Sequence, residues 1–132
     1  MAQLNPRELD VLNILWKKKD EALTSTDIVN EQRGLTQSTV IAVLRKLLKD
    51  NLVEVAGVTH SGKVLSRTYR PTEESKDVIL QHFADQYAHF KNVVPKSQLF
   101  AAILAVEQEP EQMKKEITKM KDLLTKYERK LK

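Results

Sequence analysis

The stretch LTQSTVIAVLRKLLKDNLVEV, at residues 35–55, sorts polar and apolar side chains onto opposite faces of a predicted helix. At about 100° per residue, the face opposite the apolar stripe carries Ser38, Ala42, Arg45 and Lys49. Lys46 lies to one side of this face. The small side chains would let the helix backbone approach a ligand closely, while Arg45 can reach a base edge or a phosphate. The pattern is typical of a DNA-contacting helix, although a solvated helix face looks similar.

Hydroxyl and amide groups fill the predicted first turn of this helix. They belong to Thr36, Gln37, Ser38 and Thr39. The first turn of a recognition helix usually meets the bases, and its free backbone N–H groups can hold a phosphate. A following β-prone segment adds donors that suit phosphate oxygens, at His60, Ser61, Lys63, Arg67 and Arg70. The two segments together predict a DNA-binding surface.

The charge of the chain is concentrated around the same segments. Its net charge is +4, and residues 35–70 hold six Lys and Arg against two Asp and Glu. The rest of the chain is nearly balanced. A local excess of positive charge favours a polyanionic partner such as DNA.

Candidate residues for other chemistry are few. Metal-binding side chains recur at offsets of 3 and 4 at His82, Asp85 and His89. The alternative is that these three form the exposed edge of a helix whose core side is Phe83, Tyr87 and Phe90. The absence of cysteine excludes disulfides and thiolate metal sites. No phosphate-binding glycine loop, nucleophile elbow or zinc-protease motif is present. We therefore expect no enzyme, no metal and no cofactor.

Three helices are predicted before the β-prone segment. Asn5 can cap the first helix, Pro6 suits its first turn, and Glu8 can reach back to the cap, so we expect a helix to about residue 18. Thr24 and Asp27 announce a second, short helix in the same way. The third is predicted from residue 36 to about residue 50.

A β-hairpin and three more helices complete the prediction. The runs LVEVAG and KVLSRTYRP form the hairpin, with VTHSG as its flexible tip. Further helices are expected over residues 72–92, about 97–107, and from 110 to the end. The fold class is therefore mainly α with a small β-hairpin. We assign a winged helix-turn-helix DNA-binding domain to residues 1–71 and a helical dimerisation domain to residues 72–132.

The last predicted helix carries an apolar seam. Spacings of 4, 3, 4, 3 and 4 separate Met113, Ile117, Met120, Leu124, Tyr127 and Leu131. This is the 3.5-residue repeat of a coiled coil, which predicts self-association. The alternative is a contact with the two preceding helices of the same chain.

Four segments resemble the penicillinase repressors, the BlaI/MecI/CopY family of transcriptional regulators. They read RELDVLNILWKK, LTSTDIVNE, STVIAVLRKLLKDNLVE and YRPTEES. The resemblance implies a dimeric repressor with an amino-terminal winged helix and a carboxyl-terminal helical dimerisation domain. Ile41 and Ala42 stand where family members often have arginine and threonine, and the wing is longer than is usual in the family. The cysteine-rich motif of the copper-responsive members is absent.

These observations predict a homodimeric repressor that binds a pseudo-palindromic double-stranded operator. Its half-sites would lie one helical turn, roughly 34 to 36 Å, apart. The alternative is a winged-helix module for protein assembly without sequence-specific DNA binding. No run approaches the ~20 apolar residues of a membrane span, and the start MAQLNPRELD does not look like a signal peptide. We expect a cytoplasmic protein with no membrane insertion.

The resemblance also raises the question of release from DNA. In the β-lactam-responsive members a protease cuts an Asn-Phe bond, which aligns here with Ala105 and Val106, so the side chains do not match. Without cysteine, we expect neither copper nor silver to release the protein. The polar segment VEQEPEQ at 106–112 joins two predicted helices and is the expected nick site. A regulatory protease is therefore a candidate partner.

Overall fold

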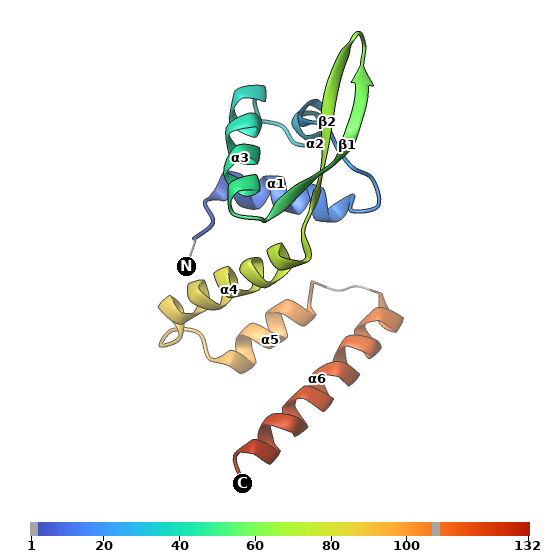
Figure 1. The fold of residues 1–132 in the computed structure, drawn as a ribbon. Coiled ribbons are helices and arrows are strands. Elements are labelled where there is room, and N and C mark those ends of the chain that lie inside the picture. Colours follow the sequence, from blue (N-terminus) through green and yellow to red (C-terminus); the bar gives the residue numbers. More distant parts are fainter. Residues whose placement is uncertain (1–2, 107–108) are drawn as a thin grey trace. The chain divides into compact units, whose positions relative to one another are not determined.

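Residues 3–106 and 109–132 are described by the structure, a computed structural model (Figure 1). They form two compact units, Met1–Gln86 and Tyr87–Lys132. The first unit holds three helices, a β-hairpin and most of a fourth helix. The second holds the end of that helix and the two helices that follow it. Local signals in the chain explain most of these boundaries, among them Asn5, Asp27 and Gly62.

The first helix, α1 (Pro6–Lys17), begins as its sequence predicts. The Asn5 side chain accepts a hydrogen bond from the Glu8 N–H at 2.8 Å. In return, Glu8 Oε1 accepts one from the Asn5 N–H, also at 2.8 Å. This capping box satisfies two N–H groups that would otherwise lack partners at the start of the helix.

The next two helices, α2 (Ser25–Glu31) and α3 (Gln37–Lys49), complete the helix-turn-helix. Thr24 and Asp27 form the predicted capping box of α2. The apolar stripe of α3 is buried as expected, through Val40, Val43, Leu44 and Leu47. It packs in one core with Leu12 and Leu15 of α1. Burial of this stripe fixes which side of α3 remains available to a partner.

The hairpin pairs β1 (Val53–Ser61) with β2 (Val64–Pro71) in antiparallel register. We expected VTHSG to form a flexible tip, and this prediction was wrong. His60 pairs with Leu65, so the strands extend to a connection of only two residues, Gly62 and Lys63. Gly62 has φ +65°, which suits the glycine-first turn of a two-residue hairpin. Gly57 lies within β1, next to a register shift, and not at the tip.

The hairpin and α4 (Glu73–Phe90) are anchored to the core of the first unit. Leu23 and Tyr69 exchange two backbone hydrogen bonds, of 3.0 and 2.8 Å, which tie the base of the wing to the segment before α2. Val78 and Ile79 of α4 pack against the core. The wing and the first turns of α4 are therefore held by the same core as α3.

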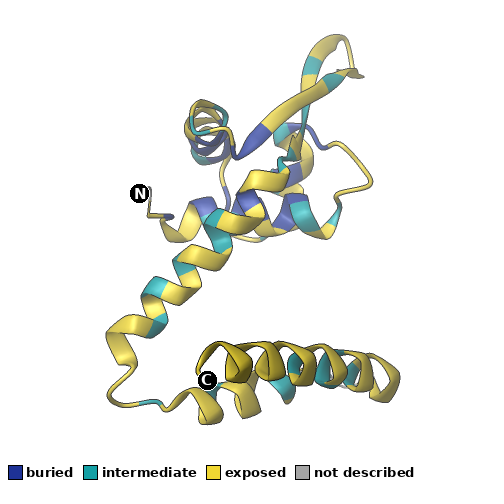
Figure 2. Ribbon diagram, turned by 60° about the horizontal axis from the view of Figure 1, so that its bottom comes forward, coloured by how far each residue is buried: buried dark blue, intermediate teal, exposed yellow. Residues whose placement is uncertain are grey.

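Burial differs sharply along the chain (Figure 2). From Tyr87 to Lys132 none of the described residues is buried. This segment contains α5 (Lys96–Leu104) and α6 (Pro110–Lys130). We expected Phe83 and Phe90 to face a core, but they are 60% and 57% exposed. No helix among the described residues is long and apolar enough to cross a membrane.

Candidate nucleic-acid interface

The first turn of α3 is fixed by its own side chains. Thr36 is the N-cap, and its hydroxyl accepts from the Thr39 N–H at 3.2 Å. The same hydroxyl donates to Thr39 Oγ1 at 2.9 Å. Gln37 Nε2 donates to Ser25 Oγ at 2.6 Å, which joins the first residue of α3 to the first residue of α2. Hydrogen bonds of Thr36, Thr39 and Gln37 therefore position the start of the helix. Ser38 is exposed, as are Thr36 and Gln37.

The predicted polar face of α3 is exposed along its length. Its exposed members are Ser38, Ala42, Arg45 and Lys49. The neighbouring Ile41 is also exposed, at 39%. An exposed isoleucine beside small residues offers apolar contact, which in DNA suits the methyl group of thymine.

A groove lies between α3 and the wing in the first unit. It is lined by Ser25, Ile41, Leu44, Arg45, Leu48, Ser66, Arg67 and Tyr69. Arg45 comes from the helix and Arg67 from the return strand, so the structure brings two predicted donors to one groove. Neither arginine has an ion pair among the described residues. Two guanidinium groups at one groove suit a bidentate acceptor such as a phosphate.

Ser25 and Ser66 line this groove and were missed in the sequence. Ser25 begins α2 and Ser66 lies on β2, so only the fold places them near Arg45. The sequence indicates them only indirectly, because Ser25 follows the predicted cap Thr24 and Ser66 precedes the predicted phosphate donor Arg67. A hydroxyl at this place can donate to a phosphate oxygen.

Two predicted cations are already paired within the chain. Lys46 Nζ lies 3.0 Å from Glu8 Oε2, and Arg70 Nε lies 2.7 Å from Glu54 Oε1. The hydrogen bond to Glu8 and the charge of that carboxylate raise the pKa of Lys46 above its usual value. The Lys46 ammonium is therefore already paired with a residue of α1 in this structure. Arg70 is held across the hairpin from Glu54, its register partner.

The remaining predicted wing residues lie near the end of the hairpin. Residues opposite each other in an antiparallel pair share a face, and faces alternate along a strand. His60 pairs with Leu65, so His60 and Arg67 share one face of the wing. Lys63 is exposed in the two-residue connection. The side chain of Ser61 lies outside the described residues.

The predicted dimerisation residues all lie on α6 or at its end, and they are at least partly exposed. Met113, Ile117 and Met120 are half-buried, while Leu124, Tyr127 and Leu131 are 52%, 58% and 87% exposed. Additional exposed apolar side chains in this unit were not predicted: Phe100, Ile103 and Leu123. The unit thus presents far more apolar surface than a solvated helix needs.

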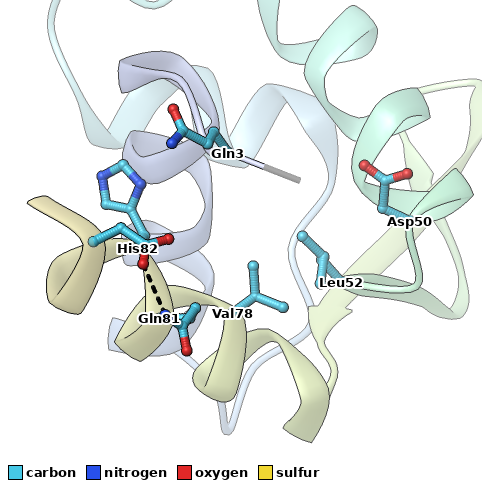
Figure 3. Close-up of a pocket in the computed structure, with 7 residues that line it drawn as sticks. Gln3, Asp50, Leu52, Val78, Gln81 and His82 are labelled. Carbon is cyan, nitrogen blue, oxygen red and sulfur yellow. Dashed lines mark hydrogen bonds between the residues drawn. The ribbon is translucent and has the colours of Figure 1, made fainter. Parts of the chain in front are cut away.

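The candidate metal ligands of α4 do not converge. His82 and Asp85 help to line a small pocket of the first unit, with Gln3, Asp50, Leu52, Val78 and Gln81 (Figure 3). Gln81 Nε2 donates to Asp85 Oδ1 at 2.8 Å, and the His82 ring lies edge-on to Phe83. Within the described ranges, no three His, Cys, Asp or Glu side chains gather as a metal site would require.

The predicted nick site is described only in part. Residues 107 and 108 lie outside the described residues, whereas Val106, Glu109 and Pro110 are exposed. Pro110 begins α6.

The winged-helix arrangement and its helix-plus-wing groove agree with a comparison of the sequence to protein families. The pattern of the penicillinase repressors matches residues 4–126. The chain belongs to the penicillinase repressor family. This match includes α1, α3, the wing and all but the end of α6. A comparison with curated proteins gives no match.

Solved structures that resemble this family member are winged-helix regulators. A variant of MepR from S. aureus aligns with 92% of this chain and 80% of its own, at 20% identity and a TM-score of 0.53. The S. aureus MepR–DNA complex aligns with 92% and 81%, at 20% identity and a TM-score of 0.50. A ferric uptake regulator from Francisella tularensis aligns with 55% of each chain, at 14% identity and a TM-score of 0.46. This chain therefore spans about half the length of the last protein, and the likeness to MepR shows the winged-helix fold.

Proposed function

We propose that this chain is a homodimeric transcriptional repressor that binds a pseudo-palindromic operator in double-stranded DNA. The observation that carries the proposal is the groove between α3 and the wing, which both Arg45 and Arg67 line, and neither arginine has an ion pair among the described residues. In winged helix-turn-helix proteins the recognition helix enters the major groove. The same arrangement here would aim Ser38, Ala42 and Arg45 at base edges, and Lys49, Lys63 and Arg67 at phosphates.

Dimer formation is proposed from the second unit. Many of its apolar side chains are exposed and none is buried, and those of α6 follow a coiled-coil repeat. A second copy would supply the surface that covers them. Two winged-helix units then meet two half-sites, so that each contact raises the effective concentration of the other. Promoter occupancy in the cytoplasm would exclude RNA polymerase, and no enzymatic step is required.

Selection of bound duplexes from a random DNA pool tests this function. We expect recovery of an inverted repeat whose halves lie about one helical turn apart. Binding should weaken steeply with salt, because each neutralised phosphate releases counterions. Failure to enrich any sequence, with an affinity that salt leaves unchanged, would reject the proposal. That result would favour a protein-assembly module, for which the exposed Val58, Val64 and Leu65 of the wing offer a surface.

Release from the operator is proposed to follow proteolysis between α5 and α6. Cutting within residues 106–112 would detach α6 and most of the apolar seam, leaving single half-site contacts. Limited proteolysis with mass spectrometry locates the cut, and a binding assay on the product measures its effect. A cut protein that stays dimeric and binds as tightly as before would contradict this mechanism. Addition of copper or silver ions to the intact complex is expected to release nothing.

A further inference from the structure

One charged side chain of the first unit is buried where no DNA can reach it. Glu8 is 1% exposed, and it is the only charged residue among the described ones that is buried. Its two carboxylate oxygens have separate partners. Oε1 accepts from the Asn5 N–H at 2.8 Å, and Oε2 contacts Lys46 Nζ at 3.0 Å. One carboxylate thus joins the start of α1 to the last turn of α3.

Lys46 stands in a different environment from the other cations of α3. Its side chain is 52% exposed but its ammonium is held by Glu8, while Arg45 lines the groove beside the wing. Lys49, one turn further along the same helix, has no ion pair among the described residues. Removing Lys46 would leave a buried carboxylate without its counter-ion, which is costly in a poorly solvated place. We therefore expect Lys46 to keep its ion pair with Glu8 when DNA binds.

We propose that Glu8 and Lys46 are positioning residues that fix the rotation of α3 on α1 and thereby the aim of the base-contacting face. The proposal rests on the DNA-binding function argued above. Since α3 presents Ser38, Ala42 and Arg45 on one narrow face, a small rotation moves all three relative to the bases. Phosphate contacts made by flexible lysines tolerate such a rotation. The pair should therefore govern specificity more than general affinity.

Three substitutions separate positioning from direct phosphate contact. Lys46→Met keeps the aliphatic stem and removes the ammonium. Glu8→Gln keeps an acceptor for the Asn5 N–H, because glutamine also completes a capping box, and removes the charge that holds Lys46. Lys49→Met is the matched control, with the same chemical change on the same helix.

Affinities are measured over a range of salt for a duplex selected by the wild type and for a shuffled duplex of equal length. For Lys49→Met we expect a salt slope that is flatter by about one unit and an unchanged ratio of specific to non-specific affinity. For Lys46→Met and Glu8→Gln we expect that ratio to fall roughly threefold to thirtyfold, a loss that lies within the range of coupling between neighbouring residues. The Lys46→Met slope should equal that of the wild type. Lys46→Arg, which retains a cation for Glu8, should restore the ratio.

Other outcomes overturn the proposal. If Lys46→Met flattens the slope by about one unit and weakens both duplexes equally, Lys46 is a phosphate donor and Glu8 only caps α1. The double variant Glu8→Gln with Lys46→Met must also show a smaller loss of specificity than the two single losses combined, because both changes remove the same ion pair. Should Lys46→Met fail to fold, an unchanged ratio in Glu8→Gln would be decisive against positioning. A wild type without salt-dependent DNA binding would instead reject the function itself, so the two failures are distinguishable.

Discussion

The two compact units of the chain solve the problem of apolar surface in different ways. In Met1–Gln86, side chains from α1, α2, α3 and the wing close one core, and Leu12, Leu15 and Leu47 have no exposed surface. In Tyr87–Lys132, none of the described residues is buried. The first unit is stabilised by its own buried core, whereas many apolar side chains of the second unit are exposed to solvent. The first unit therefore has a closed core, whereas the apolar side chains of the second unit remain at least partly exposed.

The largest expected effect follows from adding charge to the second unit, Tyr87–Lys132. The double variant Met120→Glu with Leu124→Glu would place like charges at the proposed seam, so the protein should become monomeric. Affinity for the selected duplex should fall by about 100-fold or more, because the half-sites lose their linkage. Light scattering and a binding assay measure the two effects.

The matched control adds the same charges to the polar side of α6, as Thr118→Glu with Thr125→Glu. This variant should remain dimeric. An intact dimer in the first variant would place the interface elsewhere and break the contrast between the units.

A cavity in the core of the first unit should lower the folding stability of each chain by itself, without involving a second copy. Leu47→Ala removes a side chain without any exposed surface, and we expect unfolding to become easier by about 2 to 5 kcal/mol. Denaturant unfolding followed by circular dichroism measures this. The loss should be independent of protein concentration, whereas Leu124→Ala should act mainly at low concentration, where dimers dissociate. If the stability losses of Leu47→Ala and Leu124→Ala depended equally on protein concentration, the contrast between the two units would be contradicted.

Substitution of Arg45, the arginine of α3, tests the proposed DNA-binding surface of the first unit without changing its core. Arg45 is exposed and lines the groove, so Arg45→Ala should leave the unfolding free energy nearly unchanged. Loss of a base contact should cost about 1 to 3 kcal/mol and relax the preference at one operator position. A repeat selection from the random pool reads that position directly. Wild-type binding by this variant at matched salt would show that α3 does not face the DNA.

The smallest effect is expected at the end of the wing. Lys63 is exposed in the two-residue connection, so Lys63→Ala should weaken all duplexes alike and flatten the salt slope by about one unit. Glu54→Gln is a useful companion, since it frees Arg70 from its cross-strand pair. We expect that change to strengthen non-specific binding slightly. A steeper slope in Lys63→Ala would contradict a phosphate contact at this place.

Local chemistry explains how much of this fold could be predicted from the sequence. The capping boxes at Asn5 and Thr24 use residues three positions apart, so a short window contains the whole interaction. The apolar stripe of α3 repeats within one helix and was predicted for the same reason. Strand pairing is less local: VTHS looks like a tip by itself, but the opposing strand extends β1 through it.

The candidate site shows the same limit. Exposure of Arg45 follows from helical spacing, yet its neighbour Arg67 arrives from another element. The pairing of Lys46 with Glu8 joins α1 to α3 and leaves no periodic trace in the sequence. Phe83 and Phe90 were placed in a core because a helical repeat reports that a face is apolar, not what covers it.

Trp16 is the one tryptophan of the chain, and it lies where α1 meets the start of α4. Its indole N–H donates to the buried Ser75 hydroxyl at 2.8 Å, and the Lys76 ammonium lies 4.9 Å from the ring centroid. Indole emission shifts to longer wavelength when the ring enters water and is sensitive to a nearby cation. The chain therefore carries its own fluorophore at the contact between α1 and the first turn of α4. Without any added label, that emission reports whether the first turn of α4 stays docked as DNA is bound or released.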